Sequence, residues 1–165
     1  MVRPGTGSPA ETLLVSPQLN FTGYWLPDGK ALVTVAINLE EGSAQDLALV
    51  GNGGNGPIEP LVATPFNDNF PALSRDGRWL AFASDASGRA EIYVRPLDGR
   101  DETRQVSQGG GDEPVWGPDG RELFYRSYAE GEVQLAVAWF RIAAVNRSVG
   151  RGDAGGEMVS GPLPC

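Results

Sequence analysis

The segment Pro71-Ala72-Leu73-Ser74-Arg75-Asp76-Gly77-Arg78 decides the fold, because the chain contains two further versions of it. One is Gly23-Tyr24-Trp25-Leu26-Pro27-Asp28-Gly29-Lys30, and the other is Pro114-Val115-Trp116-Gly117-Pro118-Asp119-Gly120-Arg121. The glycines of successive versions are 48 and 43 residues apart. A repeat of about 40 to 50 residues is the length of one four-stranded blade of a β-propeller. The spacing therefore predicts an array of such blades.

Each version contains an Asp-Gly pair, namely Asp28-Gly29, Asp76-Gly77 and Asp119-Gly120. An aspartate side chain accepts a hydrogen bond from its own backbone two residues on, and glycine adopts the left-handed conformation that other residues resist. We interpret these six residues as a structural turn motif, which closes the hairpin between the first two strands, A and B, of each blade.

Short runs of aliphatic, β-branched and aromatic residues recur between turn clusters, and helical periodicity is scarce. The expected strands are residues 31–37, 47–50, 61–64, 79–84, 91–95, 123–127 and 133–139. Residues 13–16 are expected to form one more strand of the kind called D, the fourth strand of a blade. Ser16 lies seven residues before the start of the first repeat, and Thr64 and Ser107 lie at the same distance before the second and third. The predicted fold class is all-β, a partial β-propeller of about three four-stranded antiparallel blades in the strand order D, ABCD, ABCD, ABC.

Residues 13–139 resemble the WD40-like repeats of TolB-type β-propellers, most clearly over Phe70–Ser127. The runs Ile92–Leu97 and Gly111–Trp116 are most similar to the propeller region that follows bacterial eukaryotic-like serine/threonine kinase domains. The resemblance implies a bacterial protein of the periplasm or another extracytoplasmic place, although residues 1–5 do not begin a signal peptide. The family motif is structural, so the resemblance assigns no functional residue.

We expect three segments along the chain. Residues 1–12 are predicted to be a disordered N-terminal segment, residues 13–139 the three-blade propeller fragment, and residues 140–165 an irregular or disordered tail. TolB-type propellers have six or more blades, so three repeats favour a fragment of a larger protein. Three blades leave an open apolar sheet face at each end. A homodimer that completes a six-blade ring is therefore one expected assembly.

The composition argues against several function classes. The 165 residues include 13 basic and 21 acidic side chains, a net charge of -8, which disfavours nucleic acid as a partner. The sequence has no histidine and a single cysteine, Cys165, so it lacks Ser-His and Cys-His nucleophile pairs. No apolar run reaches the roughly 18 residues of a membrane helix. We expect no catalytic residue, no metal, no cofactor and no membrane insertion by this chain.

Short motifs in the chain receive structural interpretations. Gly51–Gly56 fits G-x-G-x-x-G, but a strand-like segment follows it instead of a helix, so a loop between strands C and D is favoured over a nucleotide site. Arg151-Gly152-Asp153 and the sequon Asn146-Arg147-Ser148 are interpreted as chance matches in the tail. Trp25 and Trp116 occupy the repeat position of Leu73, which indicates packing between blades.

Strand direction predicts one candidate binding surface. The D-to-A and B-to-C loops emerge on one side of a blade, and they contain Glu40, Glu41, Asp68, Asp85, Asp112, Glu113 and Glu130 against one base, Arg89. We select Asp68, Asp85, Asp112 and Glu113 as candidates for an acidic face that suits a cationic peptide, a basic protein surface or a bound cation. The alternative is that exposed loops of a chain with net charge -8 are acidic without a binding role.

The functional hypothesis is a non-catalytic protein- or ligand-binding β-propeller module with a sensory or scaffold role. The alternative is the accessory propeller of a prolyl-oligopeptidase-type hydrolase whose catalytic domain is encoded outside this chain. No nucleophile motif of the G-x-S-x-G or S-x-x-K type occurs in the sequence.

Overall fold

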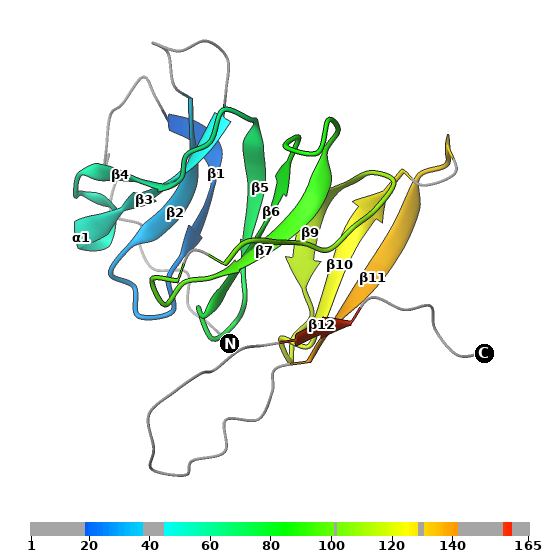
Figure 1. Ribbon diagram of the computed structural model, residues 1–165. Helices are drawn as coiled ribbons and strands as arrows, with labels where there is room; N and C mark the ends of the chain where they lie inside the picture. The colour runs from blue at the N-terminus through cyan, green and yellow to red at the C-terminus, as the bar shows by residue number, and fades with distance from the viewer. Residues whose placement is uncertain (1–18, 38–44, 101, 129–130, 142–156, 160–165) are drawn as a thin grey trace, which may run out of the picture.

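Three antiparallel sheets of four strands succeed one another in the computed structural model (Figure 1). The structure describes residues 19–37, 45–100, 102–128, 131–141 and 157–159. The first sheet holds β1 (Leu19–Trp25), β2 (Leu32–Ile37), β3 (Gln45–Val50) and β4 (Ile58–Val62). The second holds β5 (Asp68–Leu73), β6 (Trp79–Ser84), β7 (Glu91–Pro96) and β8 (Arg104–Gln105). The third holds β9 (Gly111–Trp116), β10 (Glu122–Ser127), β11 (Gln134–Arg141) and β12 (Glu157–Val159).

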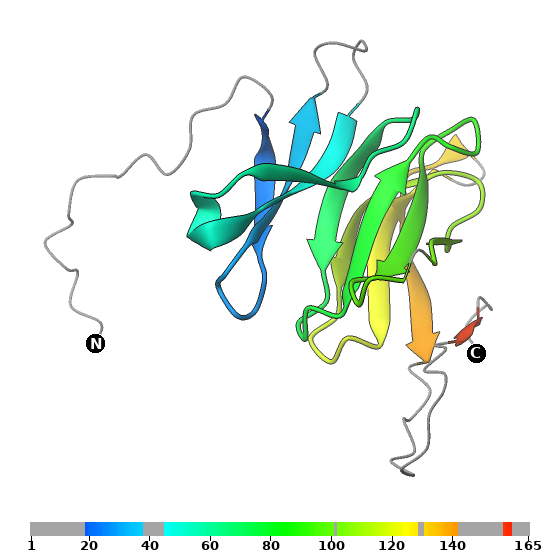
Figure 2. The same cartoon turned by 60° about the vertical axis from the view of Figure 1, so that its left-hand side comes forward.

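The sheets have the order and directions expected of propeller blades. In the first and second sheets, strands lie side by side in chain order, and each pairs antiparallel with the next. The three sheets lie roughly face to face, from blue through green to orange, and the turned view keeps that order (Figure 2). The prediction of an all-β, three-blade partial propeller is confirmed.

The A-to-B hairpins of the three sheets are built alike. The backbone N–H of Lys30, Arg78 and Arg121 donates to the carboxylate two residues earlier, at 3.0, 3.1 and 3.0 Å. The intervening glycines, Gly29, Gly77 and Gly120, have φ of 69°, 68° and 70°. Other residues are disfavoured at such φ values, so the repeated Asp-Gly pair fixes each turn locally.

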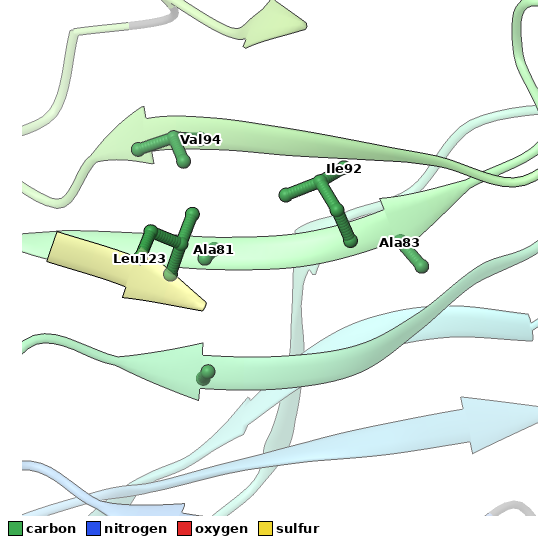
Figure 3. Close-up of a cluster of buried hydrophobic side chains, with 6 residues drawn as sticks. Ala81, Ala83, Ile92, Val94 and Leu123 are labelled. Atoms are coloured by element: carbon green, nitrogen blue, oxygen red, sulfur yellow. The ribbon is translucent and has the colours of Figure 1, made fainter. Parts of the chain in front are cut away.

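Apolar side chains hold the sheets together through two clusters. Between the first and second sheets the buried residues are Val33, Val35, Leu47, Val62, Leu80 and Phe82. Between the second and third sheets they are Ala72, Ala81, Ala83, Ile92, Val94 and Leu123 (Figure 3). Strand β6 contributes to both clusters, because Leu80 and Phe82 face one neighbour and Ala81 and Ala83 face the other. A strand that is covered on both faces needs consecutive apolar residues, as the sequence Trp79–Ala83 has.

The two tryptophans at equivalent positions of strand A have different environments. Trp116 packs against the cluster between the second and third sheets, and its indole Nε1 donates to the carbonyl oxygen of Ala72 at 3.0 Å. Leu73, at the same repeat position, packs against the other cluster. Trp25 is exposed in 47% of its area, because the first sheet has no described neighbour on that side. Packing between sheets is thus observed for Trp116 and Leu73 but not for Trp25.

The third sheet differs from the expected strand order. Its fourth strand is β12, which pairs antiparallel with β11 through Trp139 and Val159, Phe140 and Met158, and Arg141 and Glu157. The expected D strand at residues 13–16 lies outside the described residues. Part of the segment predicted as an irregular tail therefore supplies an edge strand here. Its sequence carries no match to the repeat, so the repeat pattern gave no sign of it.

The glycine-rich stretch after β3 forms one short turn, α1 (Gly51–Gly54). Asn52 and Gly53 have left-handed backbone conformations inside this four-residue element. Strand β4 begins four residues after it, as the sequence predicts. A phosphate-binding loop requires a regular helix N-terminus, so this turn is a connection between strands C and D. Within the described part of the chain, no helix is long and apolar enough to cross a membrane.

Candidate functional site

The candidate carboxylates lie where the chain enters strand A of the second and third sheets and where it leaves strand B of the second. Asp68 begins β5, Asp85 follows β6, and Asp112 and Glu113 lie in β9. Antiparallel pairing places Asp68 opposite Ser84 and Asp112 opposite Arg126, so both strand starts lie beside a strand B end. The candidates Glu40, Glu41 and Glu130 lie outside the described residues.

Asp68 is a buried carboxylate, exposed in only 1% of its area. The hydroxyl of Thr64 donates to its Oδ2 at 2.7 Å, whereas its Oδ1 accepts no well-formed hydrogen bond from the residues that the structure describes. Burial raises the pKa of Asp68, and the charges of Asp46 and Asp85 add to the rise, while the hydroxyls of Ser84 and Thr64 oppose it. None of the groups that act on the buried Asp68 carboxylate in these hydrogen bonds and charge interactions is a cation.

Asp85 lies close to Asp68 but is bound to a different partner. The backbone N–H of Asn67 donates to Asp85 Oδ1 at 2.9 Å, and the Asn67 side-chain amide donates to Oδ2 at 2.7 Å. These two hydrogen bonds lower the pKa of Asp85. The D-to-A loop between the first and second sheets is thus fastened to Asp68 through Thr64 and to Asp85 through Asn67.

Asp112 and Glu113 share one arginine. Arg126 donates from Nε and Nη2 to the two carboxylate oxygens of Asp112, at 2.8 and 2.9 Å, and Tyr128 donates its hydroxyl to the same carboxylate at 2.9 Å. The Nη2 atom of Arg126 also lies 3.0 Å from Glu113 Oε1. Burial alone would raise the pKa of Asp112, but the hydrogen bonds from Arg126 and Tyr128 lower it below its usual value. This cluster carries one net negative charge, not two.

Glu113 also has an unusual backbone. Its φ is 50°, and Phe70, at the same repeat position, has a φ of 48°. Both residues lie in the irregular part of their A strand, where the register with strand B shifts. Their side chains, with Tyr24, Pro71, Pro114 and Val115, line a hollow of about 120 Å³ beside the A strands. The repeat pattern did not indicate this feature, because a bulge depends on how the two strands pair.

Glu91 is a buried carboxylate that the sequence analysis did not select. Its exposed fraction is 2%. The hydroxyl of Ser107 donates to its Oε2 at 2.5 Å, and the backbone N–H groups of Gly109 and Gly110 donate to its Oε1 at 2.9 Å each. The Ser107 hydroxyl also accepts from the N–H of Ile92 at 2.7 Å. These bonds fasten the loop that enters the third sheet, which indicates a structural role for Glu91.

A cavity of about 610 Å³ lies between the first two sheets. Its wall comes from β4, β5, β6 and β7 and from residues 63, 64, 86 and 103. The charged residues in the wall are Asp68 and Arg95, and the aromatic ones are Phe82 and Tyr93. Pockets of about 300 to 1,000 Å³ with an apolar wall and a few polar groups are typical small-ligand sites. The fold therefore places Asp68, one of the sequence-selected candidates, in the wall of this cavity.

The described residues contain no group of three or more His, Cys, Asp or Glu side chains that could hold a metal ion. The predicted absence of a metal and of a cofactor stays a prediction for the chain as a whole. The motif Arg151-Gly152-Asp153 and the sequon at Asn146 lie outside the described residues.

Known proteins share this architecture. The chain superimposes on a TolB-type protein of Agrobacterium tumefaciens with a TM-score of 0.67 and 18% identity, over 81% of this chain and 48% of that one. It superimposes on TolB of Acinetobacter baumannii with a TM-score of 0.62 and 23% identity, over 84% of this chain and 33% of that one. The fold is that of a partial TolB-like β-propeller. This part of the expected resemblance is confirmed.

Sequence comparison also matches the chain to a curated protein. The uncharacterized peptidase YuxL of Bacillus subtilis is 32% identical over 114 residues, which are 66% of this chain and 17% of that protein. No protein-family model matches the chain. The chain thus spans less than a fifth of YuxL and less than half of each TolB structure, so each similarity concerns a segment of a larger protein.

Proposed function

We propose that this chain is a non-catalytic binding module, a partial propeller that acts through association with a protein or peptide. The observation that carries the proposal is the exposure of apolar residues on the end faces of the three-sheet array. The apolar residues at equivalent repeat positions on the inner sheet faces are buried. A surface of this kind favours association.

The outer face of the third sheet shows the contrast most clearly. Leu135 pairs with Arg126 as Ile92 pairs with Ala83 and Leu47 with Val35, so the three residues are structurally equivalent. Ile92 and Leu47 are fully buried, whereas Leu135 is exposed in 79% of its area. Val115, equivalent to the buried Ala72, is exposed in 58%.

We further propose that a second copy of the chain covers these faces and completes a six-blade ring. The superimposed part of the chain covers 48% of the Agrobacterium TolB-type protein, so the same part of two copies would match nearly all of that protein. Trp25 at one end and Leu135 at the other supply the apolar surface that such a contact would bury. Burial of apolar surface contributes about 25 cal/mol per Å² to association.

Light scattering coupled to size exclusion tests this assembly on the whole chain. The expected mass is twice 17.5 kDa, and Leu135→Asp is expected to reduce it to that of one chain. Phe66→Asp, which changes a 40% exposed side chain on a loop away from the end faces, is the matched control and should leave the mass unchanged. A wild-type chain that is folded and monomeric by circular dichroism and light scattering would overturn the second-copy proposal.

The acidic loop face remains our proposal for contact with a cationic partner. Asp85 and Glu113 are the candidate carboxylates with the most access to solvent, since Asp68 and Asp112 are mostly buried. We expect a deca-lysine peptide to bind weakly and to dissociate as salt is added, because exposed charge attraction is screened. The double variant Asp85→Asn, Glu113→Gln should weaken that binding, and equal affinity would contradict the role of these carboxylates.

A second candidate function is the accessory propeller of a prolyl-oligopeptidase-type hydrolase. The 32% identity to the YuxL peptidase favours it. The kinase-associated propeller, suggested by the runs Ile92–Leu97 and Gly111–Trp116, is the corresponding proposal for a sensory module. Sequencing the flanking coding region separates them. A G-x-S-x-G hydrolase domain downstream supports the hydrolase propeller, and a kinase domain with a transmembrane segment upstream supports the kinase-associated propeller.

A further inference from the structure

The cavity between the first two sheets has charges of opposite sign at its two ends. Asp68 pairs with Ser84 of β6, and Arg95 pairs with Leu80 of the same strand. Ser84 and Leu80 are four residues apart, which is about 13 Å along a strand. The acidic and the basic group therefore lie at opposite ends of one wall.

The same register places these side chains on one face. Directly opposed residues of an antiparallel pair share a face, and alternate residues of one strand share it too. Leu80 and Phe82 pack in the cluster toward the first sheet, so Ser84, Asp68 and Arg95 belong to that face as well. All but Leu80 line the cavity.

Each end has a distinct recognition chemistry. At one end Asp68 supplies a buried carboxylate, with hydroxyls from Thr64 and Ser84 in the same wall. At the other end, one guanidinium nitrogen of Arg95 donates to the carbonyl oxygen of Leu61 at 3.1 Å, which fixes its orientation. Guanidinium groups bind carboxylates, and carboxylates bind ammonium groups. Between the ends, the rings of Phe82 and Tyr93 stack with centroids 5.9 Å apart and form an apolar middle.

We propose that this cavity binds a short zwitterionic peptide of about three residues, with its amino terminus toward Asp68 and its carboxylate toward Arg95. Asp68 and Arg95 lie on the two strands that flank β6, so their backbones are about 16 Å apart, which combines about 13 Å along the strands with two strand spacings across them. An extended residue spans about 3.4 Å, so three residues cover about 10 Å of this separation and leave the remainder to the Asp68 and Arg95 side chains. The proposal deepens the binding role given above and rests on it, but it does not require a second copy, because both sheets of the cavity belong to one chain.

Nuclear magnetic resonance titration of the whole chain with the peptide Ala-Leu-Ala tests the proposal. The free peptide is expected to shift signals of residues around the cavity. N-acetyl-Ala-Leu-Ala and Ala-Leu-Ala-amide should each bind about tenfold more weakly, since each lacks one terminal charge. No binding by the free peptide, or equal binding by the three forms, would overturn the proposal.

Two variants assign the ends. Asp68→Asn should lower the affinity for the free peptide to that of the N-acetylated form and leave the N-acetylated form unchanged. Arg95→Gln, which keeps an N–H donor for Leu61, should lower the affinity for the free peptide to that of the amidated form and leave the affinity for the amidated form unchanged. The exposed pair Asp98 and Arg100 provides the control, because Asp98→Asn and Arg100→Gln change the same residue types away from the cavity. The amide spectrum of each variant reports its fold.

The outcomes separate this proposal from the assembly proposal. A dimer that does not bind Ala-Leu-Ala overturns only the cavity assignment. A monomer that binds the free peptide in preference to its blocked forms overturns only the second-copy assembly. Loss of affinity in both control variants would show general charge sensitivity and would overturn the assignment to Asp68 and Arg95.

Discussion

Gly77 at the tip of the β5–β6 hairpin lies against the ring of Pro27 in the turn between β1 and β2. A Cβ atom at Gly77 would be 2.6 Å from Pro27 Cδ. Gly29 and Gly120, at the same turn position of the other sheets, have no described atom within 4 Å of such a Cβ. The turn glycines of the first and third sheets thus serve only the local backbone conformation, whereas Gly77 of the second sheet also packs against the neighbouring sheet.

Gly77→Ala should therefore destabilise the protein more than Gly29→Ala or Gly120→Ala. All three place a Cβ at a φ near 70°, which costs about 1 to 2 kcal/mol. Gly77→Ala adds a clash with a proline ring, worth about 1 to 3 kcal/mol. Urea unfolding measures the free energies of unfolding. Equal losses for the three variants would show that Pro27 moves away without cost.

Asp68→Asn should raise the free energy of unfolding at pH 7. Because burial raises the pKa of Asp68, its charged form disfavours the folded state, and this penalty is absent below the usual pKa and appears as the pH rises through the raised pKa. The asparagine variant is neutral throughout. Its advantage over the wild type should shrink as the pH falls toward about 4.

Asp112→Asn is the opposite case and serves as the comparison. The pKa of Asp112 is lowered, so its contribution to stability is present above the usual pKa and is lost as the pH falls through the lowered value. The variant should lose about 1 kcal/mol at pH 7, a value for an ion pair that is partly in contact with solvent. The same sign of change for both variants in pH-dependent urea unfolding would contradict the two assigned environments.

Glu91→Gln should lower the free energy of unfolding by about 2 kcal/mol. A glutamine amide offers one acceptor oxygen where the carboxylate accepts from Ser107, Gly109 and Gly110 through two oxygens, so a buried donor loses its partner. Glu102→Gln changes an exposed carboxylate and is the control. Hydrogen exchange should show faster exchange at Gly109 and Gly110 in the Glu91 variant. Unchanged protection at both glycines would contradict the role of Glu91 as their hydrogen-bond acceptor.

Trp116→Phe should cost about 1 kcal/mol in the free energy of unfolding, because the ring is kept but the hydrogen bond to Ala72 is lost. Trp25→Phe is the matched change at the equivalent, exposed position and should cost less in the single chain. If a second copy covers Trp25, the Trp25 variant should instead weaken association at low protein concentration. Thermal unfolding at two concentrations distinguishes the two effects.

The sequence predicted the blades because their signals are local. Asp76-Gly77 fixes a turn through its own backbone, and Leu80 to Ala83 are apolar in succession because both sheet faces are covered. Such signals need no knowledge of distant residues. The site was predicted less well, since Asp68 and Asp112 were selected alike as loop carboxylates but occupy different environments.

The amino-acid sequence by itself determined the period of the repeat, the hairpins and the stacking of four-stranded sheets, since turn chemistry and alternation of apolar residues act over a few neighbours. Only the tertiary structure decided that Arg126 binds both Asp112 and Glu113, that Ser107 donates a hydrogen bond to Glu91, and that Asp68 and Arg95 line one cavity. These contacts join different strands and sheets, and their existence depends on strand register, bulges and the fit between blades.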